Sequence, residues 1–148
     1  MPVADPSTVN REMNLLYPIF ANRVNNALAK CHALGLDIEI FETWRSPQRQ
    51  DHLYASGRTR PGKIVTGSRA WQSWHQYGLA VDIAAKRAGK WSWDFDAKKA
   101  AEAFLAEGLE WLNPYEQCHF ELRNGLRIDQ ARSLTQSAGV QRLWQEVG

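Results

Sequence analysis

The chain has 148 residues, enough for one domain of ordinary size and too few for two domains that each bury a core. Hydrophobic residues make up 44% and charged residues 23% of the sequence, a composition that excludes a mainly disordered or fibrous protein. The 18 Lys and Arg residues nearly balance the 16 Asp and Glu residues, and a net charge of +2 argues against nucleic-acid binding as the main function. We therefore expect residues 1–148 to form a single domain.

The amino terminus is polar. Residues 1–14 include Asp5, Arg11 and Glu12 and contain no apolar run of the length that a secretory signal needs. No window of the chain approaches the ~20 apolar residues that cross a bilayer. We therefore expect a cytoplasmic site of synthesis. In that reducing compartment Cys31 and Cys118, which have no neighbouring cysteine, are expected to be separate thiols.

The first half of the chain predicts a helix and then a strand. Apolar residues recur with a helical period over residues 16–34, with Pro18 near the start and Gly35 as a stop. Residues 36–44 alternate in part and are rich in β-branched and aromatic side chains, which favours a strand.

A second helix and a long loop follow. Ser46 and Pro47 are typical of a helix cap and first helical position, and this helix is expected to end at Gly57. Residues 57–72 contain several glycines and a proline and predict a loop. Loops of more than ~12 residues in a small domain are usually functional.

The rest of the chain predicts three short strands and two helices, the first of these helices capped by Asp96. The strands are expected at 78–84, 109–112 and 119–122, and the helices at 97–105 and 140–147. The sequence thus predicts an α+β fold with a small antiparallel sheet flanked by helices. Four of the seven tryptophans lie in one short stretch, which indicates a groove or a lid, although interior packing would also explain them: Trp71, Trp74, Trp91 and Trp93.

Residues that bind metals concentrate in two segments, 73–82 and 116–121. A catalytic zinc site uses three protein ligands from His, Asp, Glu or Cys and leaves a fourth position open, and His75, Asp82 and His119 have the required side chains. The separation of His75 and Asp82 does not place them on one helical face, so a loop that enters a strand must bring them together. Gly78 supplies the backbone freedom for this. The spacing alone is weak evidence, because such pairs occur often by chance.

Two features of the sequence resemble the zinc peptidases that trim peptidoglycan stem peptides. They are the longer string SxHxxGxAxD, which ends at Asp82, and an acid three residues before His119. This family includes VanY-type D-alanyl-D-alanine carboxypeptidases, VanX-type dipeptidases and phage L-alanyl-D-glutamate endopeptidases. The resemblance covers residues 34–122. It implies a zinc site in a cleft on the sheet, with His75, Asp82 and His119 as ligands. It also implies Glu116 as the general base that takes a proton from the attacking water.

Residues 43–46, followed by Gln50, also resemble a segment of this family, and the resemblance implies that Arg45 points into the cleft. A guanidinium there would polarise the scissile carbonyl or hold a substrate carboxylate. Ser73 would bind substrate or a ligand, although a serine before a turn is more often structural. Without the resemblance, Glu116 would be interpreted as a surface glutamate in a turn and Arg45 as a helix-cap arginine.

Several other residues have a structural and a functional interpretation. Glu121 would share a strand face with His119 and orient it. Cys118 is interpreted as a small core residue, where many relatives have a larger or cyclic one, and the other two histidines, His32 and His52, as ordinary helix residues. The basic side chains of the 57–72 loop would attract stem-peptide carboxylates or would simply be solvated: Arg58, Arg60, Lys63 and Arg69.

The resemblance implies a zinc-dependent peptidase of the peptidoglycan stem, most plainly a phage endolysin that cuts the L-alanyl-D-glutamate bond. Because no second module resembles a cell-wall-binding domain, a thin-walled host is favoured. A D-Ala-D-Ala carboxypeptidase or dipeptidase is the enzyme alternative, since the zinc motif does not choose the bond. The second alternative is a non-catalytic zinc-containing binding module, as in Hedgehog amino-terminal domains. The presence of both Glu116 and Arg45 argues against this alternative.

The same interpretation sets the expected partners. We expect a monomer that binds peptidoglycan stem peptide, with Zn²⁺ as cofactor and no nucleic-acid partner. The enzyme would wait in the host cytoplasm until a holin-like membrane pore admits it to the cell wall in the periplasm.

Overall fold

Two of the helices predicted from apolar spacing are present in the computed structural model, which describes residues 5–148. Helix α1 spans Pro18–Ala33, with Pro18 at its first turn, and buries Phe20, Val24 and Cys31. Helix α3 spans Ala97–Ala106 and packs on α1. Both helices were predicted. The prediction for residues 1–14 lies partly outside the described residues, since residues 1–4 are not among them.

The sheet is antiparallel throughout, and its central strand is the longest. The strands are β1 (Ile38–Glu42), β2 (Ala80–Arg87), β3 (Lys90–Ser92), β4 (Glu110–Trp111) and β5 (His119–Glu121). Their order is β1-β2-β5-β4, and β3 pairs with the far end of β2. The α+β class and the small antiparallel sheet are therefore confirmed. The predicted strand at 78–84 starts later and continues to Arg87, because β2 extends into a hairpin with β3 that the sequence pattern did not reveal.

An irregularity in the β1–β2 pairing sets which residues of β1 face the site. Ile40 pairs with Ile83, and the next pair is Glu42 with Asp82, so Phe41 is an extra residue on β1. Such a β-bulge changes the regular alternation of side chains. Without it, Phe41 would be the partner of Asp82. The bulge thus places Glu42 beside Asp82, and Phe41 and Glu42 line the same cavity.

The shorter helices hold the segments around the sheet. Helix α2 spans Pro47–Ala55 and is capped by Ser46, whose hydroxyl accepts from Arg49 N at 3.0 Å, as the sequence predicted. Short 3₁₀ helices occupy η1 (Met13–Leu15) and η2 (Trp74–Tyr77), and α5 spans Val140–Val147, also as predicted for that segment.

Helix α4 (Ile128–Ala138) was not predicted. It buries only Ala131 among its residues, and its cap residue Arg127 is not a residue type that favours helix starts. It packs mainly against α5. Its apolar residues Ile128, Ala131, Leu134 and Ala138 are nevertheless at helical spacing, a signal from which this helix could have been predicted.

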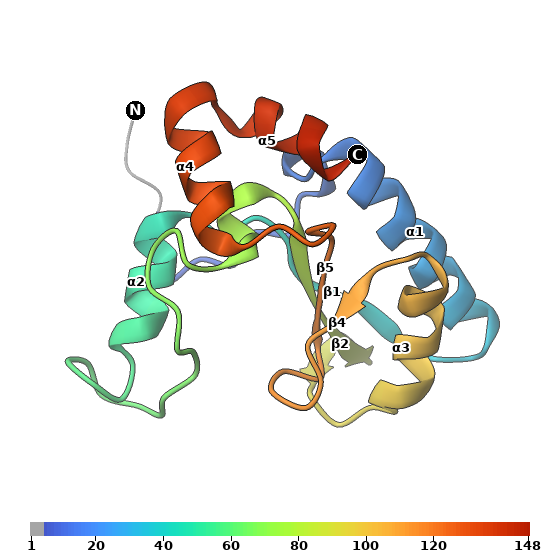
Figure 1. The fold of residues 1–148 in the computed structure, drawn as a ribbon. Helices are drawn as coiled ribbons and strands as arrows, with labels where there is room; N and C mark the ends of the chain where they lie inside the picture. Colours follow the sequence, from blue (N-terminus) through green and yellow to red (C-terminus); the bar gives the residue numbers. More distant parts are fainter. Residues whose placement is uncertain (1–4) are drawn as a thin grey trace.

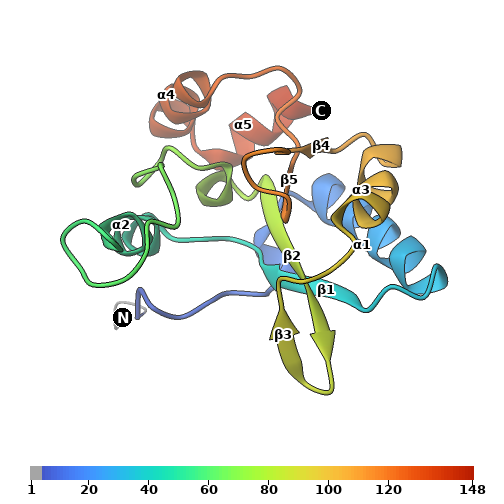
Figure 2. The same cartoon turned by 90° about the horizontal axis from the view of Figure 1, so that it is seen from below.

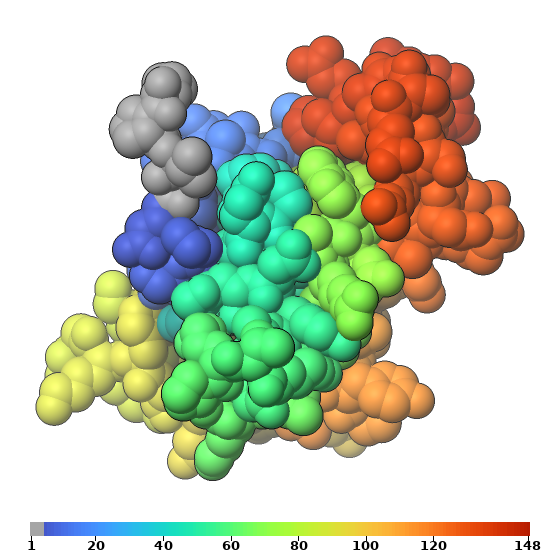
Figure 3. Space-filling view, turned by 90° about the vertical axis from the view of Figure 1, so that its left-hand side faces the viewer, coloured from blue at the N-terminus to red at the C-terminus, as the bar shows by residue number. Residues whose placement is uncertain are grey.

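The sheet separates two sides of the molecule (Figures 1 and 2). Helices α1 and α3 lie on one side, whereas α2 and the loop 57–72 lie on the other. Helices α4 and α5 lie together at one end of the molecule. Seen from the α2 side, α2 and its loop are in front, with the β2–β3 hairpin to the left and the segment before β5 to the right (Figure 3).

The described residues give two further results. No helix among residues 5–148 is long and apolar enough to cross a membrane. Cys31 and Cys118 are both free thiols, as predicted.

Candidate metal centre

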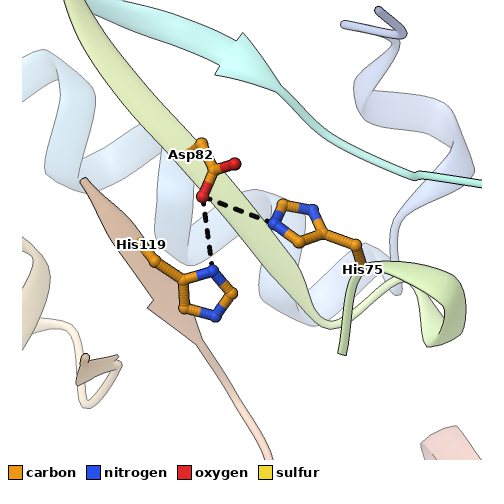
Figure 4. A group of neighbouring side chains, drawn as sticks. All are labelled: His75, Asp82 and His119. Carbon is orange, nitrogen blue, oxygen red and sulfur yellow. Dashed lines mark ion pairs between the residues drawn. The ribbon is translucent and has the colours of Figure 1, made fainter. Parts of the chain in front are cut away.

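Three side chains of metal-ligand type meet on one face of the sheet (Figure 4). His75 comes from η2, Asp82 from β2 and His119 from β5, and Asp82 and His119 are direct partners in the β2–β5 pairing. Asp82 Oδ1 lies 3.4 Å from His75 Nε2 and 3.3 Å from His119 Nδ1. One ligand atom of each residue lies within 4.8 Å of the other two. The structure thus brings together the three residues that the sequence indicated.

The segment that carries His75 depends on Gly78. This residue ends η2 with a φ of +69°, in the left-handed region that favours glycine. A Cβ atom there would lie 3.0 Å from Leu15 O and 3.1 Å from the Trp144 ring. The chain turns at Gly78 directly into β2, which carries Asp82. The prediction that Gly78 supplies the backbone freedom needed between His75 and Asp82 is confirmed by its positive φ.

The three atoms that face one another lack hydrogen-bond partners. His75 Nε2, Asp82 Oδ1 and His119 Nδ1 are buried, and none has a partner among the described residues. Buried polar atoms are nearly always satisfied, so three unsatisfied atoms around one point need a ligand to explain them. Two imidazole nitrogens and one carboxylate oxygen form a common donor set for catalytic zinc. The residues present therefore fit a zinc ion.

The second nitrogen of each imidazole ring is held by the protein. His75 Nδ1 lies 2.7 Å from the backbone oxygen of Thr43, and His119 Nε2 lies 2.8 Å from Glu121 Oε1. When each of these nitrogens carries the proton and donates it, His75 Nε2 and His119 Nδ1 are left as acceptors that can bind a metal. The expected contact between Glu121 and His119 is thus present.

Electrostatics favour ionised Asp82. Burial opposes its ionisation, but the neighbouring His75, His119 and Arg45 outweigh burial and hold the pKa of Asp82 well below its usual value. Burial also opposes protonation of His119, yet its contacts with Asp82 and Glu121 raise the pKa of His119 to about 10. The carboxylate is therefore ready to bind a cation, whereas a metal must displace a proton from His119.

Arg45 lies beside the metal-ligand group in a buried network. Its Nη2 donates to Asp82 Oδ2 at 3.1 Å and to Glu42 Oε1 at 2.8 Å, and its Nη1 donates to Gln50 Oε1 at 3.1 Å. The other oxygen of Glu42 binds the guanidinium of Arg49. These contacts fix the position of the Arg45 charge and leave two of its five N–H groups without a protein partner.

A cleft of two adjoining cavities lies over these residues. A cavity of about 170 Å³, the polar lobe, is lined by Ser68, Ser73, His75, His119 and Arg123 among others. A cavity of about 360 Å³, the apolar lobe, is lined by Phe41, Leu53, Val65, Asp82, Trp93 and Cys118 among others. Arg45, Thr66 and Glu116 line both. The metal-ligand group therefore lies where the two lobes meet.

Glu116 lies at this junction. Its Oε2 is 3.5 Å from His119 Nδ1, and its side chain is 40% exposed, in contrast to the buried ligands. A carboxylate in the cleft beside a metal position can exchange protons with a water there. Ser73 lines the polar lobe, and its hydroxyl also has a structural contact, since it accepts from His75 N at 3.3 Å.

The tryptophan cluster divides between the two interpretations. Trp74 lines the polar lobe and Trp93 the apolar lobe. Trp71 packs against Tyr77, while Trp91 packs against Phe41. The clustering thus reflects both a groove and interior packing.

Cys118 packs against the core, as the sequence suggested, and is not part of the metal-ligand group, but it is not fully buried. It is half-buried and lines the apolar lobe, because β5 begins only at the next residue and Cys118 ends the loop before it. Burial and the carboxylates of Asp82 and Glu116 raise the pKa of its thiol. His32 and His52 lie in α1 and α2, as expected.

The arginines of the 57–72 loop bind their own scaffold. The Arg58 guanidinium lies 3.8 Å from the centre of the Tyr54 ring and donates to Thr66 O. Arg60 donates to His52 O at 2.9 Å, and Arg69 contacts the Tyr54 hydroxyl. These contacts attach the loop to α2, so a structural role accounts for these three arginines.

Two buried polar residues lie behind Arg45: Glu42 was not predicted, and Gln50 was recognised only as part of the family segment, without a role. Glu42 is 1% exposed, and Gln50 is fully buried and also accepts from Gln76 Nε2 at 3.1 Å. Alternation from Ile38 and Ile40 would place Glu42 on their face of the strand, but the bulge at Phe41 turns it to the face of Asp82, where it is buried. A charged residue at such a position usually has a charged partner.

Comparison with known families places most of the chain in one of them. Residues 14–127 match the VanY family, described as D-alanyl-D-alanine carboxypeptidase. This range contains Arg45, the three metal-ligand residues and Glu116, and it ends before α4.

Two proteins of known activity are similar to the chain. Peptidoglycan L-alanyl-D-glutamate endopeptidase CwlK of Bacillus subtilis strain 168 is 42% identical over 82 residues, 55% of this chain and 49% of that protein. The chain thus matches about half the length of this relative. The crystal structure of the Serratia marcescens L-Ala D-Glu endopeptidase ChiX has a TM-score of 0.53 and 23% identity, and the match covers 74% of this chain and 81% of that one. This structure supports the fold.

Proposed function

The chain belongs to the VanY family, and from this premise we propose that it is a zinc-dependent peptidase that cuts the L-alanyl-D-glutamate bond of peptidoglycan stem peptides. The observation that carries the proposal is the group of three buried, unpartnered ligand atoms at the base of a cleft. The cleft also holds Glu116 and Arg45, which a purely structural metal site would not need.

His75, Asp82 and His119 would hold the zinc ion through the three atoms that face one another. A bound zinc ion supplies Lewis-acid chemistry, which polarises a carbonyl group and makes water more acidic. Glu116 accepts the proton of the attacking water and returns it to the nitrogen of the leaving amine. Its partial exposure lets it reach a water in the cleft while it remains near the ligands.

Arg45 stabilises the negative charge that grows on the carbonyl oxygen. Its guanidinium lines both lobes and is fixed by Glu42 and Gln50, so little reorganisation is required when the charge develops. Ser73, in the polar lobe, supplies a hydroxyl that can bind the peptide backbone of the substrate.

The choice of bond rests on the relatives. CwlK, at 42% identity over 82 residues, is named for the L-alanyl-D-glutamate bond, whereas the family as a whole is described by its carboxypeptidase activity. Digestion of purified peptidoglycan followed by mass spectrometry separates the two. We expect peptides with a new amino group on D-glutamate, whereas free D-alanine as the main product would support the carboxypeptidase alternative.

The roles of metal and base are tested by separating them. A chelator should abolish hydrolysis and zinc should restore it, with about one zinc per chain by metal analysis. Glu116→Gln keeps the shape of the side chain and should retain zinc while turnover falls by on the order of 10² or more. Loss of zinc in this variant would instead make Glu116 a ligand, and hydrolysis that survives complete chelation would exclude the metallopeptidase.

We also propose a biological setting, a phage endolysin that is made in the host cytoplasm and reaches the periplasm through a holin-like pore, as a monomer. The proposed substrate supports this setting, since peptidoglycan lies beyond the inner membrane. Expression together with a pore-forming partner should lyse a thin-walled host, whereas expression alone should be tolerated. The Glu116→Gln variant should be inactive in both conditions, and lysis that persisted with it would indicate membrane damage by another part of the chain.

A further inference from the structure

Trp93 is the largest exposed aromatic side chain that lines the cleft. It is 57% exposed, although it lines the apolar lobe together with Asp82 and Glu116. Its ring is held against Phe41 at 4.7 Å between centroids in an edge-to-face arrangement. Phe41 in turn packs against Trp91 at 5.2 Å. The Trp93 ring is therefore supported by Phe41 and offers an exposed aromatic surface to a ligand in the lobe.

The rest of the apolar lobe suits a ligand with few charges. Leu53 and Val65 line it together with Trp93, and Val65 is itself 56% exposed. The arginines that reach the lobe, Arg45 and Arg49, are both paired with Glu42. Exposed apolar side chains gathered around a cavity mark a binding surface.

The apolar lobe continues away from the metal-ligand group. Trp93 and Cys118 also line a further cavity of about 290 Å³, with Phe95, Ala97 and Gln117. The groove thus runs from Asp82, past the Trp93 ring, to the start of α3. A ligand that enters along it can extend well beyond one amino acid on the Trp93 side of the scissile bond.

The two halves of the proposed substrate differ in the same way as the two lobes. On the acyl side of the bond, L-alanine is attached directly to a muramic acid sugar and carries no free carboxylate. On the amine side, D-glutamate and the residues after it carry carboxylates. A pyranose ring presents apolar C–H groups on its face and hydroxyls at its rim, so an aromatic ring beside a cavity is a suitable surface for it.

We propose that the apolar lobe is the subsite for the muramoyl-L-alanine half of the substrate, with the face of the sugar ring against Trp93. The carboxylate-bearing half then occupies the polar lobe, where Ser68 and Ser73 offer hydroxyl groups. This proposal rests on the proposed function and deepens it, since the sugar would make the enzyme select peptides that are still attached to glycan.

The test compares two substrates that differ only in the sugar. One is a muramoyl stem peptide, and the other is the same peptide with an acetyl group on L-alanine. In the Trp93→Ala variant, the kcat/KM ratio of muramoyl to acetyl substrate should fall about tenfold, and Trp93→Phe should retain part of the preference. Leu34→Ala is the control, because Leu34 is 52% exposed and lies outside the cleft. An equal loss on both substrates, or no loss, would overturn the subsite.

A binding measurement tests the subsite independently of the proposed function, because it does not require hydrolysis. Calorimetry with muramoyl-L-alanine should show binding to the wild-type and Leu34→Ala proteins and about tenfold weaker binding to Trp93→Ala. If the wild-type enzyme cuts neither substrate, the proposed bond is wrong, and this measurement alone still decides the subsite. Absent or Trp93-independent binding of muramoyl-L-alanine would overturn the subsite and leave the peptidase intact.

Discussion

The contact between Glu121 and His119 gives a quantitative prediction for metal affinity. Glu121 Oε1 lies 2.8 Å from His119 Nε2, and the two side chains are only 6% and 5% exposed. Removal of the carboxylate therefore leaves a buried N–H group without its partner. A buried hydrogen bond to a charged group contributes about 1.5–3 kcal/mol, which corresponds to roughly 10- to 100-fold in a binding constant. Mutation of a residue that hydrogen-bonds to a metal ligand usually lowers metal affinity by ~10–100-fold.

Two substitutions divide this effect into parts. Glu121→Gln keeps an oxygen that can accept the hydrogen bond but removes the charge, so we expect zinc affinity about 10-fold weaker. Glu121→Ala removes the acceptor as well, and we expect about 100-fold weaker affinity. The affinity is measured by competition with a chromophoric chelator, and thermal unfolding of the metal-free proteins checks that both variants fold.

Glu110→Gln is the matched control. Glu110 contacts the same arginine as Glu121, with its Oε1 at 3.2 Å from Arg123 Nε, but it is among the exposed ion pairs of the surface. Loss of this glutamate should leave zinc affinity unchanged. Wild-type affinity in Glu121→Ala would refute the argument that this carboxylate orients His119, and an equal loss in Glu110→Gln would attribute the effect to Arg123 or to general charge.

Three further outcomes are expected. Because the pKa of His119 is raised to about 10, zinc must displace a proton from this side chain. Zinc affinity should therefore fall about tenfold per pH unit as the pH decreases from 8 to 6, and equal affinity at these pH values would contradict this. Gly78→Ala should lower the free energy of unfolding in urea by ~2 kcal/mol, more than Gly89→Ala does. Both glycines have a positive φ, but only at residue 78 would the added Cβ atom contact Leu15 and Trp144. Equal losses would exclude a role for these contacts. Glu42→Gln should reduce turnover and lower stability by about 3 kcal/mol, because the buried Arg49 loses its counter-charge and the buried Arg45 is left with Asp82 alone. Unchanged urea unfolding would contradict this.

The sequence by itself determined the elements whose signal is local. Helices α1 and α3 have strong apolar periodicity, and Ser46 and Asp96 both act as helix caps, as side-chain oxygens at these positions usually do. The metal-ligand residues were identified because the motif from Ser73 to Asp82 and the acid before His119 are specific in combination. The β2–β3 hairpin was missed because its second strand has only three residues. Helix α4 was missed although Ile128, Ala131 and Leu134 are at helical spacing.

Only the tertiary structure decided how these residues meet. The β-bulge at Phe41 brings Glu42 beside Asp82, and the strand register that pairs Asp82 with His119 depends on contacts between segments far apart in the chain. The choice of Nε2 in His75 and Nδ1 in His119 depends on which backbone oxygen or carboxylate holds the other nitrogen. The Trp93 surface and the division of the cleft into two lobes likewise arise from side chains of several elements. Periodicity and spacing describe neighbours along the chain, so they contain no information about these contacts between distant segments.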